Sequence, residues 1–146
     1  MPTTADPSGF DEPTPIRTPQ DVFRRWRDLM GPLGFTRRHL WFQFVTPDGL
    51  LAPPLSRVED IPEDLDPEAA DGLMQILELT LPTVGADSTV ALLLSRPGPA
   101  RMTRSDLGWA RGLIDAAART GVALQPIHLA TDEAIRVFAA DDLLPA

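Results

Sequence analysis

Three side chains of the kinds that build hydrolase active sites, Ser95, Asp106 and His128, lie within one stretch of the chain. A serine hydroxyl, an imidazole and a carboxylate can form a nucleophilic triad when they lie within hydrogen-bonding distance of one another. The chain has no G-x-S-x-G turn, the motif that positions a serine nucleophile in one large class of hydrolases. The triad is therefore an alternative interpretation of this stretch, which no motif supports.

A group of arginines beside these residues could bind an anion. Arg96, Arg101 and Arg104 surround Thr103, where a helix is predicted to begin. The first amides of a helix have no acceptor within the helix, and guanidinium groups form forked hydrogen bonds with carboxylates and phosphates. Arg96, Arg101, Thr103 and Arg104 are therefore a candidate site for a peptide carboxylate or a small phosphate. The other interpretation is a solvated loop whose arginines pair with nearby acidic residues.

Asp106 has two interpretations of its own. It follows Thr103 at the spacing of a capping box, in which the carboxylate accepts a hydrogen bond at the start of a helix and favours its dipole. Asp106 could instead be a metal ligand, but a hydrolytic zinc ion needs about three protein ligands and a water molecule. The neighbouring residues do not complete that set. The sequence therefore favours the capping box, and we predict no metal and no cofactor.

The elements that must position these residues form a strand, helix and strand unit. Residues 88–95 are a continuous apolar run, which is typical of a central strand covered on both faces. A helix is predicted from Thr103 to about Thr120, with Gly121 as its C-cap, followed by a strand over residues 122–129. A crossover of this length is right-handed and joins parallel strands. Its chemistry would lie at the sheet edge where open α/β sheets bind ligands, formed by Ser95, Arg96, Thr103, Asp106 and His128.

The flanking segments predict two more helices. Thr18 followed by Pro19 is typical of a helix start, and Gly31 or Gly34 would end that helix. The segment 66–68 opens the second helix with Asp, Pro and Glu. Its core-facing residues are predicted to be Ala69, Leu73, Ile76, Leu77 and Thr80.

Further strands complete the predicted sheet. Residues 39–45 alternate in the manner of a strand, and the turn at residues 46–49 leads into a partner strand at residues 50–52. Pro53 and Pro54 limit that partner to a short or edge strand. A last short strand is predicted at residues 135–138. We therefore expect an α/β fold, a single domain with a mixed sheet of about five or six strands and three helices packed on its two faces.

Composition excludes several classes of function. The 146 residues are sized for one domain, which we assign to residues 18–146, and the proline-rich residues 1–17 are predicted to be a disordered tail. The chain has no cysteine for disulfides or thiolate metal sites and no lysine for Schiff-base chemistry. A net charge of −8 opposes nucleic-acid binding. Neither a secretory leader nor a membrane span is visible, so we expect a cytoplasmic protein.

The stretch around Thr103 resembles the core of the JAB/MPN metalloprotease family, in its RadC-like branch. That family carries an H-x-H pair, a proline loop, an S-x-x-D motif opening a helix, a glycine at the helix end and a strand with Asp-His. Here Thr103-Arg-Ser-Asp106 matches S-x-x-D with Thr in place of Ser. Gly121 stands where the family has the glycine that ends the helix, and Ile127-His128 lies near the position of the family's Asp-His. The likeness covers roughly residues 38 to 130. It implies the JAB/MPN architecture for the predicted α/β domain.

The metal ligands of that family are missing. With the family's spacing kept, its two ligand histidines fall on Leu93 and Ser95; with the loop proline aligned to Pro97, they fall on Leu94 and Arg96. Neither register supplies an imidazole. Arg96 would also place a fixed positive charge close to the position of the dication.

The resemblance together with these substitutions implies a non-catalytic JAB/MPN-like protein. We expect it to bind another protein, a peptide or a small anionic ligand, and neither nucleic acid nor a membrane. The alternative is a hydrolase, similar to a peptidase or isopeptidase, with an atypical metal or serine-based site at the same sheet edge. The sequence leaves the biological process, the identity of a partner and the oligomeric state open.

Overall fold

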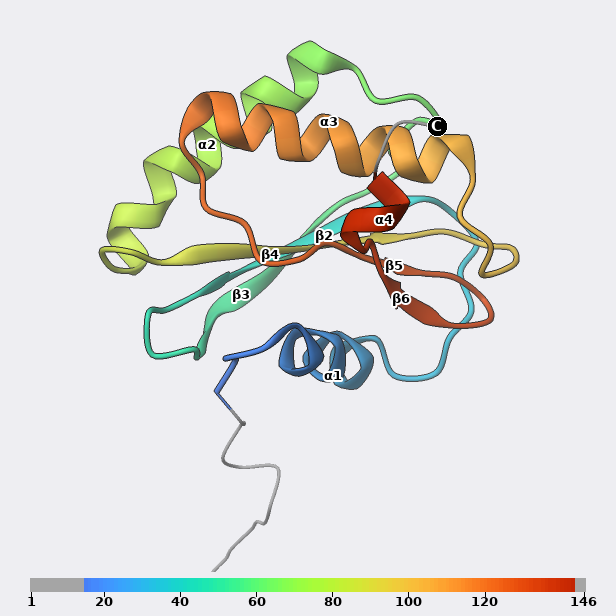
Figure 1. The fold of residues 1–146 in the computed structure, drawn as a ribbon, viewed down its shortest axis with the longest axis horizontal. Coiled ribbons are helices and arrows are strands. Elements are labelled where there is room, and N and C mark those ends of the chain that lie inside the picture. Colours follow the sequence, from blue (N-terminus) through green and yellow to red (C-terminus); the bar gives the residue numbers. More distant parts are fainter. Residues whose placement is uncertain (1–14, 144–146) are drawn as a thin grey trace, which may run out of the picture.

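The structure, a computed structural model, describes residues 15–143. In chain order its elements are α1 (Pro19–Met30), β2 (His39–Val45), β3 (Leu51–Val58), α2 (Pro67–Val84), β4 (Thr89–Ser95), α3 (Arg104–Thr120), β5 (His128–Ala130), β6 (Ile135–Val137) and α4 (Ala140–Leu143). The described residues form a single-domain α/β fold, as predicted, with the short helix α4 in addition to the three predicted helices (Figure 1).

Five strands form one mixed sheet in the order β3-β2-β4-β5-β6. β2 is antiparallel to β3 and β4, β4 is parallel to β5, and β5 is antiparallel to β6. The central strand is β4, and its residues 90–95 are all buried, as the apolar run predicted. β3 is an edge strand, as Pro53 and Pro54 indicated, but it is longer than predicted and reaches Val58. The mixed sheet and the parallel crossover through α3 are therefore confirmed.

Residues 122–129, which follow α3, were predicted to be a strand, but only their end, from His128 onward, belongs to a strand, β5. β4 pairs with this segment at Val90 with Leu124, through an isolated bridge, and again at Leu93 with His128. From Val90 to Leu93 is a step of three residues along β4, whereas from Leu124 to His128 is a step of four along the paired segment. The pairing therefore slips by one residue. Pro126 lies in that interval and has no amide proton to give to a ladder. As a result, β5 begins at His128 instead of ending near it.

α1 covers one face of the sheet, while α2 and α3 cover the other (Figure 1). α1 starts at Thr18, as predicted, and Thr18 forms a capping box with Asp21; the helix ends at Gly31, one of the two glycines predicted to end it. Its inward side chains Val22 and Trp26 are buried. They belong to a cluster with the sheet residues Val45, Ala91, Leu93, Ala130 and Ile135.

The predicted disordered tail reached Arg17, and residues 1–14 of it lie outside the described residues. Ile16, near the end of that segment, is buried in the α1 core, and its N–H donates to the carbonyl of Gly49 at 2.7 Å. Gly49 has a positive φ of 86°, and a Cβ there would lie 2.7 Å from the Ile16 carbonyl oxygen. The close approach of the two backbones therefore requires glycine, and the ordered domain begins before Thr18.

The side of α2 that faces the core differs from the predicted side. It starts at the predicted N-cap Asp66, but its buried residues are Ala70, Met74 and Leu77. Of the five predicted core positions only Leu77 is buried, and Ile76 is exposed. Because α2 carries apolar residues on two sides, periodicity alone could not distinguish its inner face from its outer face.

The acidic loop before α2 is held against α3. Trp109 is buried, and its indole N–H lies 3.0 Å from the carbonyl oxygen of Pro62 and 3.1 Å from that of Glu63. Leu65 packs beside Gly112, where a Cβ would lie 2.0 Å from the Leu65 Cδ2 atom. The missing side chain at Gly112 therefore makes room for Leu65 against the helix.

Candidate functional site

Arg96 and Asp106 form a buried ion pair between the end of β4 and the first turn of α3. Arg96 is 4% exposed and Asp106 is 2% exposed. The Arg96 Nε and Nη2 atoms donate to Asp106 Oδ1 and Oδ2, each at 2.8 Å. The remaining guanidinium donors bind the carbonyls of Pro97 and Arg101, each at 2.9 Å. All three guanidinium nitrogens thus donate to acceptors within the protein.

Asp106 also caps α3, as predicted. Its carboxylate accepts from the Thr103 N–H at 2.8 Å, and the Asp106 N–H donates to the Thr103 hydroxyl at 3.2 Å. The helix ends at Gly121 in the left-handed conformation, which is also as predicted. Burial opposes the charged form of Asp106, but hydrogen bonds from Arg96 and Thr103 outweigh it, so the pKa of Asp106 lies below its usual value.

The structure separates the four residues of the candidate anion site. Arg96 is buried and all three of its guanidinium nitrogens donate within the protein, and the Thr103 hydroxyl is occupied by the helix cap. Arg101 and Arg104 are exposed. Arg38, which the sequence interpretation did not include, lies 3.9 Å from the Asp106 carboxylate and donates to Ser105 at 3.3 Å. Two exposed arginines therefore remain of the predicted group.

Acidic residues from the turn after β5 hold the loop that follows β4. The Asp132 carboxylate accepts from the N–H of Gly98 at 2.8 Å and from that of Phe35 at 2.9 Å. These backbone hydrogen bonds hold the pKa of Asp132 below its usual value. Glu133 accepts from the Ala100 N–H at 2.7 Å. The loop is thus fixed by contacts within the chain, and no sequence motif indicated these two acids.

Ser95 and His128 lie on the α1 face of the sheet. Ser95 accepts a hydrogen bond from the Trp41 indole N–H at 2.8 Å, and it pairs with Ala130 across the sheet. His128 is fully buried beneath α1, with its ring centroid 6.1 Å from that of Phe23. It was expected at the end of the second strand, but the pairing slip places it at the start of β5.

The imidazole of His128 is poorly placed for proton transfer. Its Nδ1 atom lies 3.2 Å from the Pro126 carbonyl oxygen, and its Nε2 atom has no hydrogen-bond partner among the described residues. Burial lowers the pKa of His128 to about 4. Ser95 and His128 face α1, whereas Asp106 belongs to α3 on the other face. The structure therefore does not bring the three residues of the alternative triad together.

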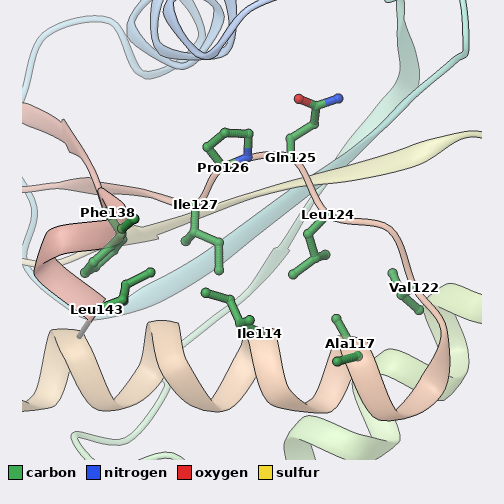
Figure 2. Close-up of a pocket in the computed structure, with 11 residues that line it drawn as sticks. Ile114, Ala117, Val122, Leu124, Gln125, Pro126, Ile127, Phe138 and Leu143 are labelled. Carbon is green, nitrogen blue, oxygen red and sulfur yellow. The ribbon is translucent and has the colours of Figure 1, made fainter. Parts of the chain in front are cut away.

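An apolar pocket of about 500 Å³ lies on the opposite side of α3 from α2 (Figure 2). Its walls come from α3, the segment before β5 and the region of α4, through Ile114, Ala117, Leu124, Ile127, Phe138 and Leu143. The side chain of Gln125 points away from it, and its amide donates to the Thr89 hydroxyl at 3.0 Å. A second hollow of about 400 Å³ continues past Ile114 and Leu143.

The contacts of Arg96 also show whether Asp106 and its neighbours could bind a metal ion. Both carboxylate oxygens of Asp106 are bound by Arg96, so these residues do not fit a zinc ion at this position. In residues 15–143 no three His, Cys, Asp or Glu side chains form a group that could hold a metal.

No helix within residues 15–143 is long and apolar enough to cross a membrane. No family model matches the chain, and no curated protein matches it.

Proposed function

We propose that this protein is a non-catalytic member of the JAB/MPN class, of the RadC-like branch, that acts by binding another protein. The observation that carries the proposal is the buried ion pair between Arg96 and Asp106. It occupies the position in the crossover where a hydrolase of this class would need ligands for its metal. The pair satisfies the groups that would otherwise be open to a metal or a substrate.

The register of the resemblance that aligns Pro97 agrees best with this geometry. That register puts the family's ligand histidines at Leu94 and Arg96, and it matches the ligand aspartate to Asp106 if the loop before α3 is one residue shorter than in the family. Leu94 lies near the end of β4 and Arg96 directly follows the strand, so alternation places both on the same face of the sheet, and the Arg96 side chain reaches the Asp106 carboxylate. The guanidinium then balances the carboxylate charge that a dication would balance in an active enzyme.

The apolar pocket beside α3 offers a surface for the partner. Its volume lies within the usual range of about 300–1,000 Å³ for ligand pockets, and its walls are apolar side chains. A continuous apolar hollow on a protein surface is a common feature of binding sites. We infer that it accepts apolar side chains from an extended or helical segment of the partner protein.

Zinc titration tests the absence of a catalytic zinc ion. Purified protein prepared without chelator should carry no stoichiometric zinc, and added zinc should not raise its thermal stability. A ligand at a hundredfold excess over its dissociation constant would stabilise the fold by about 2.7 kcal/mol, which a thermal scan resolves. Stoichiometric zinc, or a stabilisation of that size, would contradict the proposal.

A pair of double variants tests the resemblance itself. Leu94→His with Arg96→His should create a zinc site together with Asp106. Leu93→His with Ser95→His should not, because those positions face α1. Zinc binding is measured by calorimetry, and circular dichroism verifies that both variants are folded. Binding by the second pair alone would contradict the register.

A neutral apolar dye such as Nile red tests the pocket. The parent should bind the dye, and Ile114→Glu should abolish binding because it places a charge in the wall shared by both hollows. Leu50→Glu is the matched control, since Leu50 is also a partly exposed apolar residue and lies in the β2–β3 hairpin. Equal dye binding by Ile114→Glu and the parent would remove the pocket from the proposal.

A further inference from the structure

The outer face of α2 carries an apolar stripe that the domain itself does not cover. Ile76 is 61% exposed and Leu79 is 76% exposed, more than any other large apolar side chain in the described residues. They lie one helical turn apart and are therefore neighbours on the helix surface. The side of α2 that packs on the domain is formed by Ala70, Met74 and Leu77.

The stripe has the spacing of a helix-pairing seam. Ala69, Gly72, Ile76, Leu79 and Thr83 follow one another at intervals of three and four residues, the pattern that keeps one side of a helix facing a second helix. We call these five residues the α2 seam. Apart from its chain neighbours and the nearby backbone of α2 itself, no atom lies within 4 Å of the position where a Cβ would stand at Gly72, so the seam has open space there.

The polar groups along the seam are already satisfied. The Thr83 hydroxyl donates to the Thr80 carbonyl at 2.6 Å, and the Thr80 hydroxyl donates to the Ile76 carbonyl at 2.8 Å. Covering the seam would therefore not bury an unpaired hydroxyl, which would be costly. The threonine methyl groups remain available for apolar contact.

The centre of the seam has no flanking charges, which would select a different partner. In helix pairs, charged residues beside the seam set the choice and orientation of the partner. Here the flanking positions around Ile76 and Leu79 are Gln75, Thr80 and Pro82, all uncharged, and the charged flanking residue is Glu68, at the end of the seam beside Ala69. On a chain with a net charge of −8, such a neutral strip lets two copies approach without direct repulsion.

The order of residue sizes makes the seam complementary to itself. Large side chains stand at its centre and small ones toward its ends. If two copies pair antiparallel about a two-fold axis between Ile76 and Leu79, Ile76 meets the partner's Leu79 and Gly72 meets the partner's Thr83. A two-fold interface requires this kind of self-complementary patch. We propose that the α2 seam joins two copies of this chain as an antiparallel pair of helices.

The length of the seam sets the expected strength of the dimer. From Ala69 to Thr83 it spans roughly 21 Å at about 1.5 Å per residue. One helix pair of this length lies at the small end of specific interfaces, so we expect a dissociation constant of about 1–100 µM. The seam and the pocket beside α3 are separate surfaces, so the dimer does not depend on the proposed function.

Sedimentation velocity between about 0.5 and 500 µM tests the dimer, because this range spans the expected dissociation constant. The parent should change from monomer to dimer, and Leu79→Glu should weaken association at least about tenfold. Leu50→Glu, which changes an exposed apolar residue elsewhere, should associate like the parent. A parent that stays monomeric throughout, or a dimer unaffected by Leu79→Glu, would overturn the proposal.

Cross-linking tests the orientation of the helices. The chain has no cysteine, so the variants Ile76→Cys and Leu79→Cys each carry a single thiol. When the two variants are mixed and oxidised, the disulfide between unlike variants should exceed those between like variants. Circular dichroism verifies that each is folded, as expected for substitutions at exposed positions. A dominance of disulfides between like variants would indicate parallel helices and refute the proposed pairing.

Discussion

The guanidinium of Arg96 and the carboxylate of Asp106 meet through parallel hydrogen bonds beneath the surface, at the junction between β4 and α3. The same carboxylate caps α3 through Thr103. One acidic side chain therefore neutralises a buried cation and starts a helix. These contacts make the junction between β4 and α3 important for stability.

Asp106→Asn should lower the free energy of unfolding by about 3–5 kcal/mol, because it leaves the Arg96 charge buried without a partner. Arg96→Met should have a similar cost, since it leaves Asp106 without its main donor. The double variant should lose less than the sum of the two, with a coupling of about 0.5–3 kcal/mol. Urea unfolding measures all four proteins. Additive losses would mean that the two groups do not stabilise each other.

His128 should make the stability depend on pH between pH 7 and pH 5. Burial lowers its pKa from 6.5 to about 4, so the unfolded chain takes up a proton before the folded one does as the pH falls. Stability is therefore complete above pH 6.5 and decreases below it, by about 2 kcal/mol at pH 5. Urea unfolding of His128→Leu should show a smaller decrease over this interval. Equal decreases in both proteins would argue against a neutral buried imidazole.

Gly112→Ala should be less stable than Gly108→Ala by about 1–3 kcal/mol, the usual cost of overpacking. A Cβ at Gly112 would lie 2.0 Å from Leu65, whereas no atom lies within 4 Å of a Cβ at Gly108. Both changes replace a glycine within α3, so the difference between them isolates the contact with Leu65. Thermal unfolding provides the comparison. Leu65→Ala in the same chain should reduce the difference, and a difference unchanged by it would assign the cost elsewhere.

Arg101→Ala and Arg104→Ala should each change stability by no more than about 0.5 kcal/mol, because both side chains are exposed. Inorganic phosphate should raise the melting temperature of the parent and of the double variant equally, relative to sodium chloride of matched ionic strength. A phosphate effect that is present in the parent and lost in the double variant would restore the anion site, with Arg38 as a further candidate.

Local signals in the sequence predicted most of the elements. Thr103 and Asp106 stand at capping-box spacing, and Gly121 stands where a helix must end, so α3 could be predicted from neighbouring residues alone. The apolar run before Ser95 likewise predicted the central strand. The interpretation in which the loop arginines pair with nearby acidic residues holds for Arg96, but it described a solvated loop, and neither the partner Asp106 nor the burial of the pair was predicted, because the sequence does not show on which side of the loop the arginine folds.

The errors came from contacts between distant segments. The position of His128 depends on a slip in pairing with β4, and the strand pattern of residues 122–129 does not reveal it. The inner side of α2 depends on packing against α3 and the sheet, since both sides of the helix are apolar. Ile76 was therefore expected in the core, and its exposure became visible only in the folded chain.

The two cores that the sheet separates each contain a tryptophan. Trp26 lies in the α1 core and Trp109 in the core under α2 and α3, while Trp41 lies on the sheet beside Ser95. Variants that keep a single indole would report on one layer at a time by fluorescence. Urea titrations of such variants would then reveal whether the two halves of the molecule melt together or in sequence.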